Sequence, residues 1–394
     1  MTESATIVVL GTFDSKPEEH IFLKNAIEAR AHQVLTVNVG TGQAPGFTPD
    51  YDLRPEGITG RDLAINKVID QGFQLLGRLY RQGAIGGVIS AGGGSGTHIC
   101  TSIMKALPLG VPKVMISTVA ARDMAPVIGV RDITMIHSVS DLLGVNSING
   151  PILDAGAGAI CGMVDSQWEP AGHGKRIALT MFGFITRSAE MIRSRLEAMG
   201  HEVIAFHANG VGGLAMEKLA AEGWFDGILD LATHELADSL YPGGYCRLIG
   251  PGRLEPVDGL SIPRLVVPGG LDCIVLEFNR DNVPPQYEDR RIFFYDFRSA
   301  IHVNADEGRI LADQLIDRIN RSKSPIQILI PSRGWSEAET GAGEPLFDPE
   351  VGRQMVSALK SECNPNITIR EMDKHILEPE FADAAAKLMN QMLE

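Results

Sequence analysis

Short apolar runs alternate along the chain with longer amphipathic segments, and glycine follows many of the apolar runs. In the first half, the apolar runs predict strands at Thr6–Leu10, Gln33–Val39, Ala84–Ser90, Pro112–Ile116 and Asp132–Ile136. The amphipathic segments between them predict helices from Pro17 to about Ala31 and over Arg61–Gln82, Thr97–Leu107 and Pro151–Val164. Strands that alternate with helices in this way form a parallel sheet covered by helices.

The second half repeats the same alternation after a polar linker at Asp165–Gly174. Strands are expected at Lys175–Thr180, Val203–His207, Asp226–Leu231, Arg264–Val267, Cys273–Phe278, Ile292–Tyr295, Ile326–Ile330 and Thr368–Met372. Helices are expected at Arg187–Met199, Leu214–Glu222, Asp306–Asn320, Glu350–Ser361 and from Pro379 onward. We therefore expect an α/β protein with two Rossmann-like, doubly wound domains, 1–170 and 171–394, with mainly parallel sheets and a cleft between the domains.

Length and composition agree with a two-domain globular protein, since 44% of the 394 residues are hydrophobic. The five cysteines are scattered and include no CxxC pair, so neither a disulfide framework nor a thiolate metal site is indicated. No signal segment or membrane-length apolar run is present, which favours a cytoplasmic protein. The net charge of −14 opposes attraction to nucleic acid and to anionic membranes, so local groups must hold any anionic ligand.

The central strand of the first half runs into the glycine-rich turn Ala91–Thr97, which opens a helix. Glycines allow backbone N–H groups to converge on an anion, and the start of the following helix carries partial positive charge. A phosphate, nucleotide or carboxylate site is therefore expected on Gly92, Gly93, Gly94, Ser95, Gly96 and Thr97. A tight strand-to-helix turn without a ligand would use the same residues, and the spacing fits neither a P-loop nor the Rossmann fingerprint.

A second candidate loop, Gly11–Lys16, follows the first strand. Gly11, Thr12 and Lys16 offer an N–H group, a hydroxyl and an ammonium group to phosphates, and Asp14 offers oxygen to magnesium. The alternative is a structural one, because Asp14 or Ser15 before Pro17 would also cap a helix.

The second half places several reactive side chains where predicted strands end. The candidate catalytic residues are His207, Asp230, Glu235 and Arg298, and Asp272 and Arg333 lie at similar positions. Arginine binds carboxylates through a planar fork, and a carboxylate or imidazole acts as a general base when its pKa is tuned. A zinc site on His207, His234 and Glu235 lacks a supporting motif, and serine hydrolase chemistry lacks a GxSxG turn.

Several motifs appear together and in a fixed order along nearly the whole chain. They are GTFDSK at 11–16, AGGGSGT at 91–97, IGVRDITMIHSVSDLLGVNSI from Ile128, FHANGVGG at 206–213, DLATHEL at 230–236, PGRLEPVDGLSIPRLVVPGGLD at 251–272 and PSRGWS at 331–336. With these motifs the chain resembles the family of the tomato mosaic virus resistance protein and its bacterial relatives, whose N-terminal region is an ATP-binding module of two domains.

The resemblance implies two Rossmann-like domains, ATP with magnesium in the first domain, and a homodimer. It implies no antiviral activity here, because the chain lacks the C-terminal barrel domain of the plant proteins. The chain departs from the family pattern at Ser15, at Ile301–Glu307 and at His234. These departures concern the chemistry expected of the second domain more than the nucleotide binding expected of the first.

Three functions follow from these observations. The first is an ATP-binding protein that acts on a small anionic metabolite in the cleft between its domains. The second is a nucleotide-free lyase or hydrolase of sugar-acid type, whose glycine loops bind the substrate's carboxylate or phosphate. The third is a non-catalytic, nucleotide-gated module that binds another protein.

Overall fold

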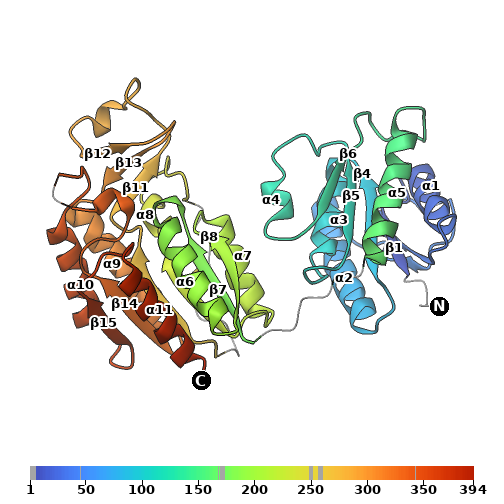
Figure 1. The fold of residues 1–394 in the computed structure, drawn as a ribbon. Helices are drawn as coiled ribbons and strands as arrows, with labels where there is room; N and C mark the ends of the chain where they lie inside the picture. Colours follow the sequence, from blue (N-terminus) through green and yellow to red (C-terminus); the bar gives the residue numbers. More distant parts are fainter. Residues whose placement is uncertain are drawn as a thin grey trace. The chain divides into compact units, whose positions relative to one another are not determined.

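The computed structural model describes residues 6–44, 46–166, 168, 174–247, 252–255, 261–341 and 343–394. The chain divides into two compact units, Met1–Pro170 and Ala171–Glu394. Each unit contains a six-stranded parallel sheet with helices interleaved, which confirms the predicted α/β class of two Rossmann-like domains (Figure 1). Most of the predicted linker lies outside the described residues. The cleft between the domains stays a prediction.

The first unit has the strand order β3-β2-β1-β4-β5-β6, with every pair parallel. Its strands are β1 (Ile7–Gly11), β2 (Val34–Asn38), β3 (Tyr51–Asp52), β4 (Gly87–Gly92), β5 (Lys113–Ser117) and β6 (Thr134–His137). The central strands β1, β4 and β5 are buried along their full length because helices cover both faces of the sheet. The short strand β3 lies between the predicted strand Gln33–Val39 and the predicted helix Arg61–Gln82, where the sequence predicts no strand.

The helices of the first unit are α1 (Pro17–Glu28), α2 (Arg61–Arg81), α3 (Gly94–Met104), α4 (Ala125–Ile128) and α5 (Asn149–Asp165). Helices α1 and α5 pack together on one face of the sheet, and α2 and α3 pack together on the other (Figure 1). Alternate residues of β1 supply the two cores, with Ile7 and Val9 toward α1 and α5, and Val8 and Leu10 toward α2 and α3.

The second unit has the strand order β15-β14-β10-β9-β7-β8, again with parallel pairs. Its strands are β7 (Arg176–Met181), β8 (Glu202–His207), β9 (Gly227–Ala232), β10 (Arg264–Gly269), β14 (Ile326–Pro331) and β15 (Thr368–Met372). Its helices are α6 (Thr186–Ala198), α7 (Val211–Ala221), α8 (Glu235–Asp238), α9 (Ala305–Asn320), α10 (Pro349–Glu362) and α11 (Pro379–Met392). Helices α6 and α11 cover one face of this sheet, and α7, α9 and α10 cover the other.

A small antiparallel sheet separates β10 from α9 along the chain. It has the order β11-β13-β12, from β11 (Cys273–Leu276), β12 (Ile292–Phe294) and β13 (Ser299–His302). The sequence predicts β11 and β12 as strands but misses β13, whose last two residues belong to the segment that departs from the family pattern. Short antiparallel strands have no helical crossover between them, so the alternation that identifies the main sheets does not identify this one.

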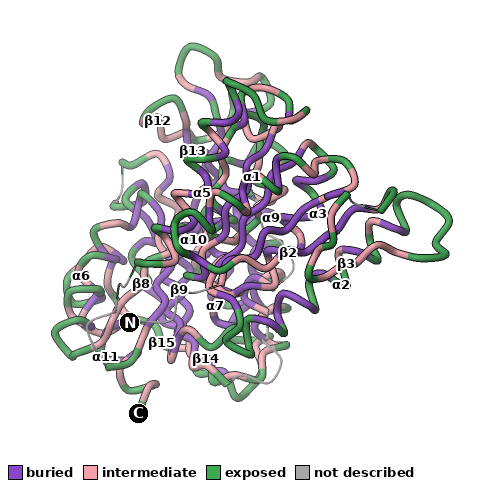
Figure 2. Tube along the Cα trace, turned by 90° about the vertical axis from the view of Figure 1, so that its right-hand side faces the viewer, coloured by how far each residue is buried: buried purple, intermediate pink, exposed green. Residues whose placement is uncertain are grey.

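Burial follows the strands. Figure 2 shows buried residues concentrated along the sheets and exposed residues along the loops and the outer faces of the helices. Within the described ranges, no helix has both the length and the apolar character needed to cross a membrane.

Candidate functional site

The strand order of the first unit reverses between β1 and β4, which are neighbours in the sheet. Open α/β sheets bind ligands at such a switch point, beyond the carboxyl ends of the strands. The two predicted glycine-containing loops follow these two strands. They lie side by side, because a Cβ atom added to Gly96 would be 3.7 Å from Thr12 Oγ1.

Helix α3 begins at this switch point without a side-chain cap, since its N-cap residue is Gly93. The N–H groups of Gly94, Ser95 and Gly96 belong to the first turn and have no acceptor within the helix. Gly94 and Ser95 are exposed, and a Cβ atom added to Gly94 would meet nothing within 4 Å. Ser95 Oγ accepts a hydrogen bond from Arg61 Nη2 at 3.4 Å. The start of α3 therefore offers N–H donors in open space.

Thr97 does not take part in this exposed turn. It is buried, and its hydroxyl lies 2.7 Å from Ser117 Oγ on β5. Gly92 is also buried, and a Cβ atom there would come within 3.2 Å of Gly96. The structure thus gives Gly92 and Thr97 a packing role in the turn, which corrects their expected role as direct phosphate ligands.

Asp14 reaches the loop that follows β2. Its Oδ2 accepts a hydrogen bond from the Gly42 N–H at 2.7 Å, and its Oδ1 is buried with no hydrogen-bond partner among the described residues. An unpaired carboxylate oxygen of this kind is a ligand that a hard cation such as magnesium prefers. Thr12 is partly exposed, and its hydroxyl accepts from Ser15 Oγ at 2.9 Å.

Gly11 and Lys16 make contacts with the protein itself. A Cβ atom on Gly11 would lie 1.9 Å from His20 Nε2, so this buried glycine makes room for the histidine ring. Lys16 Nζ donates to the backbone oxygen of Leu142. The sequence assigns both residues to phosphate binding, whereas these contacts favour a packing role for Gly11 and a loop-anchoring role for Lys16.

The second unit has its switch point between β7 and β9. Four buried side-chain atoms that follow β9 and β10 lack a hydrogen bond of good geometry in the described part of the chain: Thr233 Oγ1, Glu235 Oε2, Asp272 Oδ1 and His234 Nε2, the last of which has only an ion-pair contact with Asp238 Oδ1 at 3.3 Å. Buried polar atoms are normally hydrogen-bonded, so a group of unpaired ones indicates a missing partner such as a ligand or an ion. We call Thr233, His234, Glu235 and Asp272 the unpaired cluster.

His207 and Arg298, both predicted from the sequence, lie within electrostatic reach of this cluster. Burial lowers the pKa of His207, and the positive charges of His234 and Arg298 lower it further, while Glu235 raises it. Arg298 pairs with Asp296 at 2.7 Å and lies over the ring of Tyr245, 4.6 Å from its centroid. His207 is therefore within electrostatic range of Glu235 and Arg298, and the catalytic role expected of these three residues stays a prediction.

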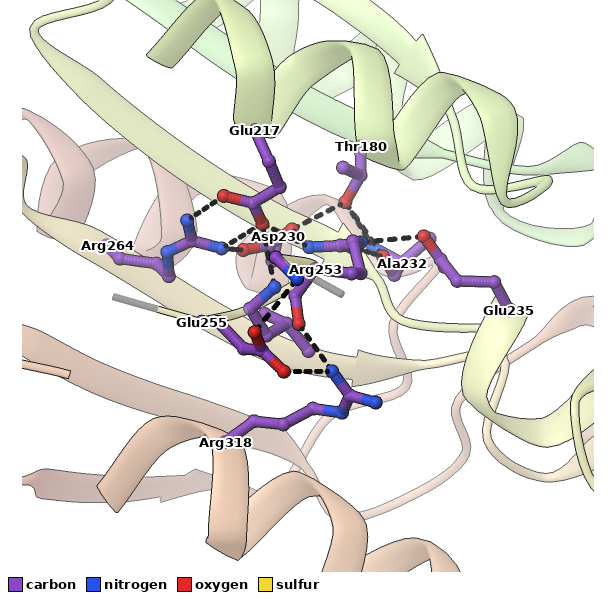
Figure 3. Close-up of polar contacts among 11 residues, drawn as sticks. Thr180, Glu217, Asp230, Ala232, Glu235, Arg253, Glu255, Arg264 and Arg318 are labelled. Carbon is purple, nitrogen blue, oxygen red and sulfur yellow. Dashed lines mark hydrogen bonds and ion pairs between the residues drawn. The ribbon is translucent and has the colours of Figure 1, made fainter. Parts of the chain in front are cut away.

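Asp230 lies elsewhere, in a buried network of ion pairs (Figure 3). Its two oxygens lie 2.7 Å from Arg253 Nη1 and 2.7 Å from Arg264 Nη1. Arg253 Nε also donates to Glu235 Oε1 at 2.7 Å, and Glu217 pairs with both arginines. With both oxygens paired to buried arginines, Asp230 has a structural role rather than the expected catalytic one.

The ion-pair network fixes the orientation of Glu235, which is itself a member of the unpaired cluster. Arg253 occupies Glu235 Oε1 and leaves Oε2 without a partner. Gly213 in the first turn of α7 permits this arrangement, because a Cβ atom there would lie 2.4 Å from Glu235 Oε1 and 2.7 Å from Arg253 Nε. Gly213, in the motif FHANGVGG, is thus required for close packing.

Two buried acids, Glu339 and Asp272, lie near the end of β14. Glu339 is buried, and burial together with the Asp272 charge raises its pKa to about 8. Burial also raises the pKa of Asp272, whose Oδ2 accepts a hydrogen bond from Ser336 Oγ at 2.5 Å. Glu339 borders a cleft of about 300 Å³ that is also lined by Arg333, Trp335, Phe347, Arg353 and Lys360. Of these cleft residues, only Arg333 is predicted from the sequence.

Residues 5–169 match the N-terminal domain, and residues 174–393 the C-terminal domain, of the uncharacterised protein family UPF0261. A UPF0261 protein of Clostridium tetani is 34% identical over 408 residues, which covers 98% of this chain and 99% of that protein. The ToMV resistance protein Tm-1(GCR237) of Solanum lycopersicum is 31% identical over 320 residues, covering 79% of this chain and 41% of the tomato protein.

Among solved structures, the chain is similar to a co-structure of S. aureus MnaA with UDP. The identity is 12% and the TM-score 0.25, over 66% of this chain and 78% of that chain. Such a low TM-score supports no conclusion about the ligand. The family matches cover both units, and the chain belongs to the uncharacterised protein family UPF0261.

Proposed function

We propose that the first unit binds the phosphates of a nucleotide, ATP with magnesium, and that the second unit acts on a small anionic metabolite. The observation that carries the first part is the position of the two loops, which meet at the switch point between β1 and β4. The uncapped start of α3 supplies N–H donors there, and Asp14 supplies an unpaired carboxylate oxygen for the cation.

The proposed phosphate contacts are fewer than the sequence suggests. Gly93, Gly94 and Ser95 form the exposed face of the turn, and Thr12 lies beside it. Lys16 is not required, because its ammonium group already donates to the Leu142 backbone.

A negative charge introduced at the start of α3 should weaken anion binding without destabilising the fold. In the Gly94→Asp variant, we expect the affinity for Mg-ATP to fall by at least about tenfold, because the carboxylate occupies and repels the phosphate position. The same carboxylate lies at the positive end of the helix, so the stability of the first unit should rise by about 0.3–1 kcal/mol. Calorimetric titration with ATP and a non-hydrolysable analogue, together with thermal unfolding, measures the two effects.

The control for this charge effect is Gly94→Asn, which adds a side chain of nearly the same size without charge. The site has room for either side chain, since nothing lies within 4 Å of an added Cβ atom. Near wild-type ATP affinity in both variants would contradict the nucleotide site at this turn. So would a complete absence of ATP binding by the wild-type protein.

The magnesium part of the proposal predicts a second, cation-dependent effect. The Asp14→Asn variant should lose most of the increase in ATP affinity that magnesium gives the wild-type protein, while its affinity for ATP in the presence of a chelator stays the same. The amide oxygen keeps an acceptor for the Gly42 N–H but removes the negative charge. Asp154→Asn, an exposed acid of the same unit, is the matched control. If magnesium increases the ATP affinity equally in the wild-type protein and in both variants, Asp14 does not bind the cation.

The nucleotide-free lyase or hydrolase remains the second candidate function. The unpaired cluster in the second unit favours it, because these atoms call for a ligand there whether or not the first unit binds ATP. If the wild-type protein binds no nucleotide with or without magnesium, this enzyme becomes the preferred function. The non-catalytic module is the third, and it predicts that ATP binds while no metabolite does. Homodimer formation and a cytoplasmic location are further parts of the proposal, to be tested by sedimentation and by fractionation.

A further inference from the structure

Three ligand-type side chains of the second unit converge on one buried point. His234 Nε2, a carboxylate oxygen of Asp238 and Cys246 Sγ all lie within 4.8 Å of one another, and all three residues are buried. In the described ranges, these residues form the one group of three or more histidine, cysteine or acidic side chains with this geometry. His234 and Asp238 are four residues apart across α8, so their side chains share one face.

The surroundings fix His234 in a metal-binding orientation. Its Nδ1 lies 2.7 Å from the backbone oxygen of Gly270, so Nδ1 donates that hydrogen bond and a metal ion would take the place of a proton on Nε2. Phe182 stacks on the ring with 4.2 Å between the ring centroids, and Nε2 forms an ion-pair contact with Asp238 Oδ1 at 3.3 Å, so the two proposed ligand atoms face each other. A backbone carbonyl on the far nitrogen is the usual support of a metal-bound histidine.

Asp238 is held equally firmly by the backbone. Its two oxygens accept the N–H groups of Val275 and Cys246, each at 2.7 Å. Each oxygen keeps a further lone pair for a cation. Gly244 lets the turn that carries Cys246 pack directly on α8, because a Cβ atom on Gly244 would lie 1.9 Å from the Asp238 backbone oxygen.

From this geometry we propose that His234, Asp238 and Cys246 form a binding site for one divalent metal ion of the zinc type. A set of one nitrogen, one oxygen and one sulfur ligand suits zinc and cobalt and does not suit magnesium or calcium. Three protein ligands leave a fourth position for water or for an oxygen of the substrate, as in catalytic zinc sites. The ligand set differs from the group His207, His234 and Glu235, for which the sequence offers no supporting motif.

The proposal goes beyond nucleotide binding, because it concerns the second unit alone. The test is a titration of the chelator-treated full-length protein with cobalt chloride, followed by absorption spectroscopy. The wild-type protein should bind one equivalent of cobalt and show a cobalt–thiolate charge-transfer band, and zinc chloride should displace the cobalt. Cys246→Ser should lose this band and bind cobalt at least about 100-fold more weakly.

Cys363→Ser is the matched control, since Cys363 is a half-buried thiol of the same unit outside the site. This variant should keep the band and the affinity. His234→Gln tests the nitrogen ligand and should also weaken cobalt binding, and if it fails to fold, the Cys246→Ser result alone decides. No cobalt or zinc binding by the wild-type protein, or an unchanged band in Cys246→Ser, would overturn the site. Neither result would bear on ATP binding by the first unit.

Discussion

Replacing Arg253 by methionine is expected to destabilise the second unit by about 3–5 kcal/mol. The Arg253 side chain is 1% exposed and interacts with three buried carboxylates, those of Glu217, Asp230 and Glu235. Methionine fills much of the same volume but leaves these carboxylates with less positive charge to balance them. An uncompensated buried charge is far more costly than the loss of a surface ion pair.

Urea unfolding followed by the fluorescence of Trp335, a buried residue of the second unit, measures this loss. The control is Arg321→Met, which removes an exposed arginine that pairs with Asp317 at 3.0 Å and should cost less than about 1 kcal/mol. Adding Glu235→Gln to Arg253→Met removes one of the unbalanced charges and should restore part of the stability. Equal losses in Arg253→Met and Arg321→Met would show that the network does not hold the unit together.

The ion-pair network of the second unit contains pairings that the sequence alone does not predict. Strands such as β7 and β9 are predictable because a parallel sheet covered on both faces requires continuous apolar runs. Asp230 places a charge inside the apolar run of β9, two residues before the strand ends, and a charge so close to the end of a strand resembles a catalytic group. Only the fold shows that Arg253, from a distant loop, pairs with Asp230. Spacing along the chain does not reveal such a partner.

In the first unit, by contrast, the local sequence predicts much of the candidate site. The glycines after β4 and the loop after β1 are short-range signals, and the alternation of strands and helices predicts the parallel sheet that carries them. The order that makes β1 and β4 neighbours comes from the structure. The direction of individual side chains does not follow from that pattern. Thr97 turns toward Ser117, a residue on the next strand of the sheet, and its burial depends on packing that becomes visible only in three dimensions.

Acid should weaken the first unit through His20. This ring is 1% exposed, and its Nδ1 lies 2.6 Å from the Lys16 backbone oxygen, while Nε2 has no hydrogen-bond partner in the described part of the chain. Burial lowers the His20 pKa to about 4, and the Lys16 ammonium group lowers it further, although nearby backbone oxygens oppose the change. A histidine of the unfolded chain has a pKa of about 6.5.

The sign of the effect follows from this difference. The unfolded chain takes up the proton first, so the stabilising contribution of neutral His20 is complete above about pH 6.5 and is lost as the pH falls toward 4. The full difference corresponds to about 3 kcal/mol, of which about 2 kcal/mol should disappear between pH 7.5 and pH 5.

The measurement is urea unfolding at these two pH values, with the first unit followed by hydrogen exchange of the peptides that cover β1 and α1. In His20→Asn the difference in stability between the two pH values should shrink by about 2 kcal/mol, because asparagine does not titrate but still donates to the Lys16 oxygen. His98→Asn, an exposed histidine of the same unit, should leave the pH dependence unchanged. A wild-type slope in His20→Asn would show that another group is responsible. The comparison depends on a slope rather than on absolute stability, so the small cavity left by asparagine does not affect it.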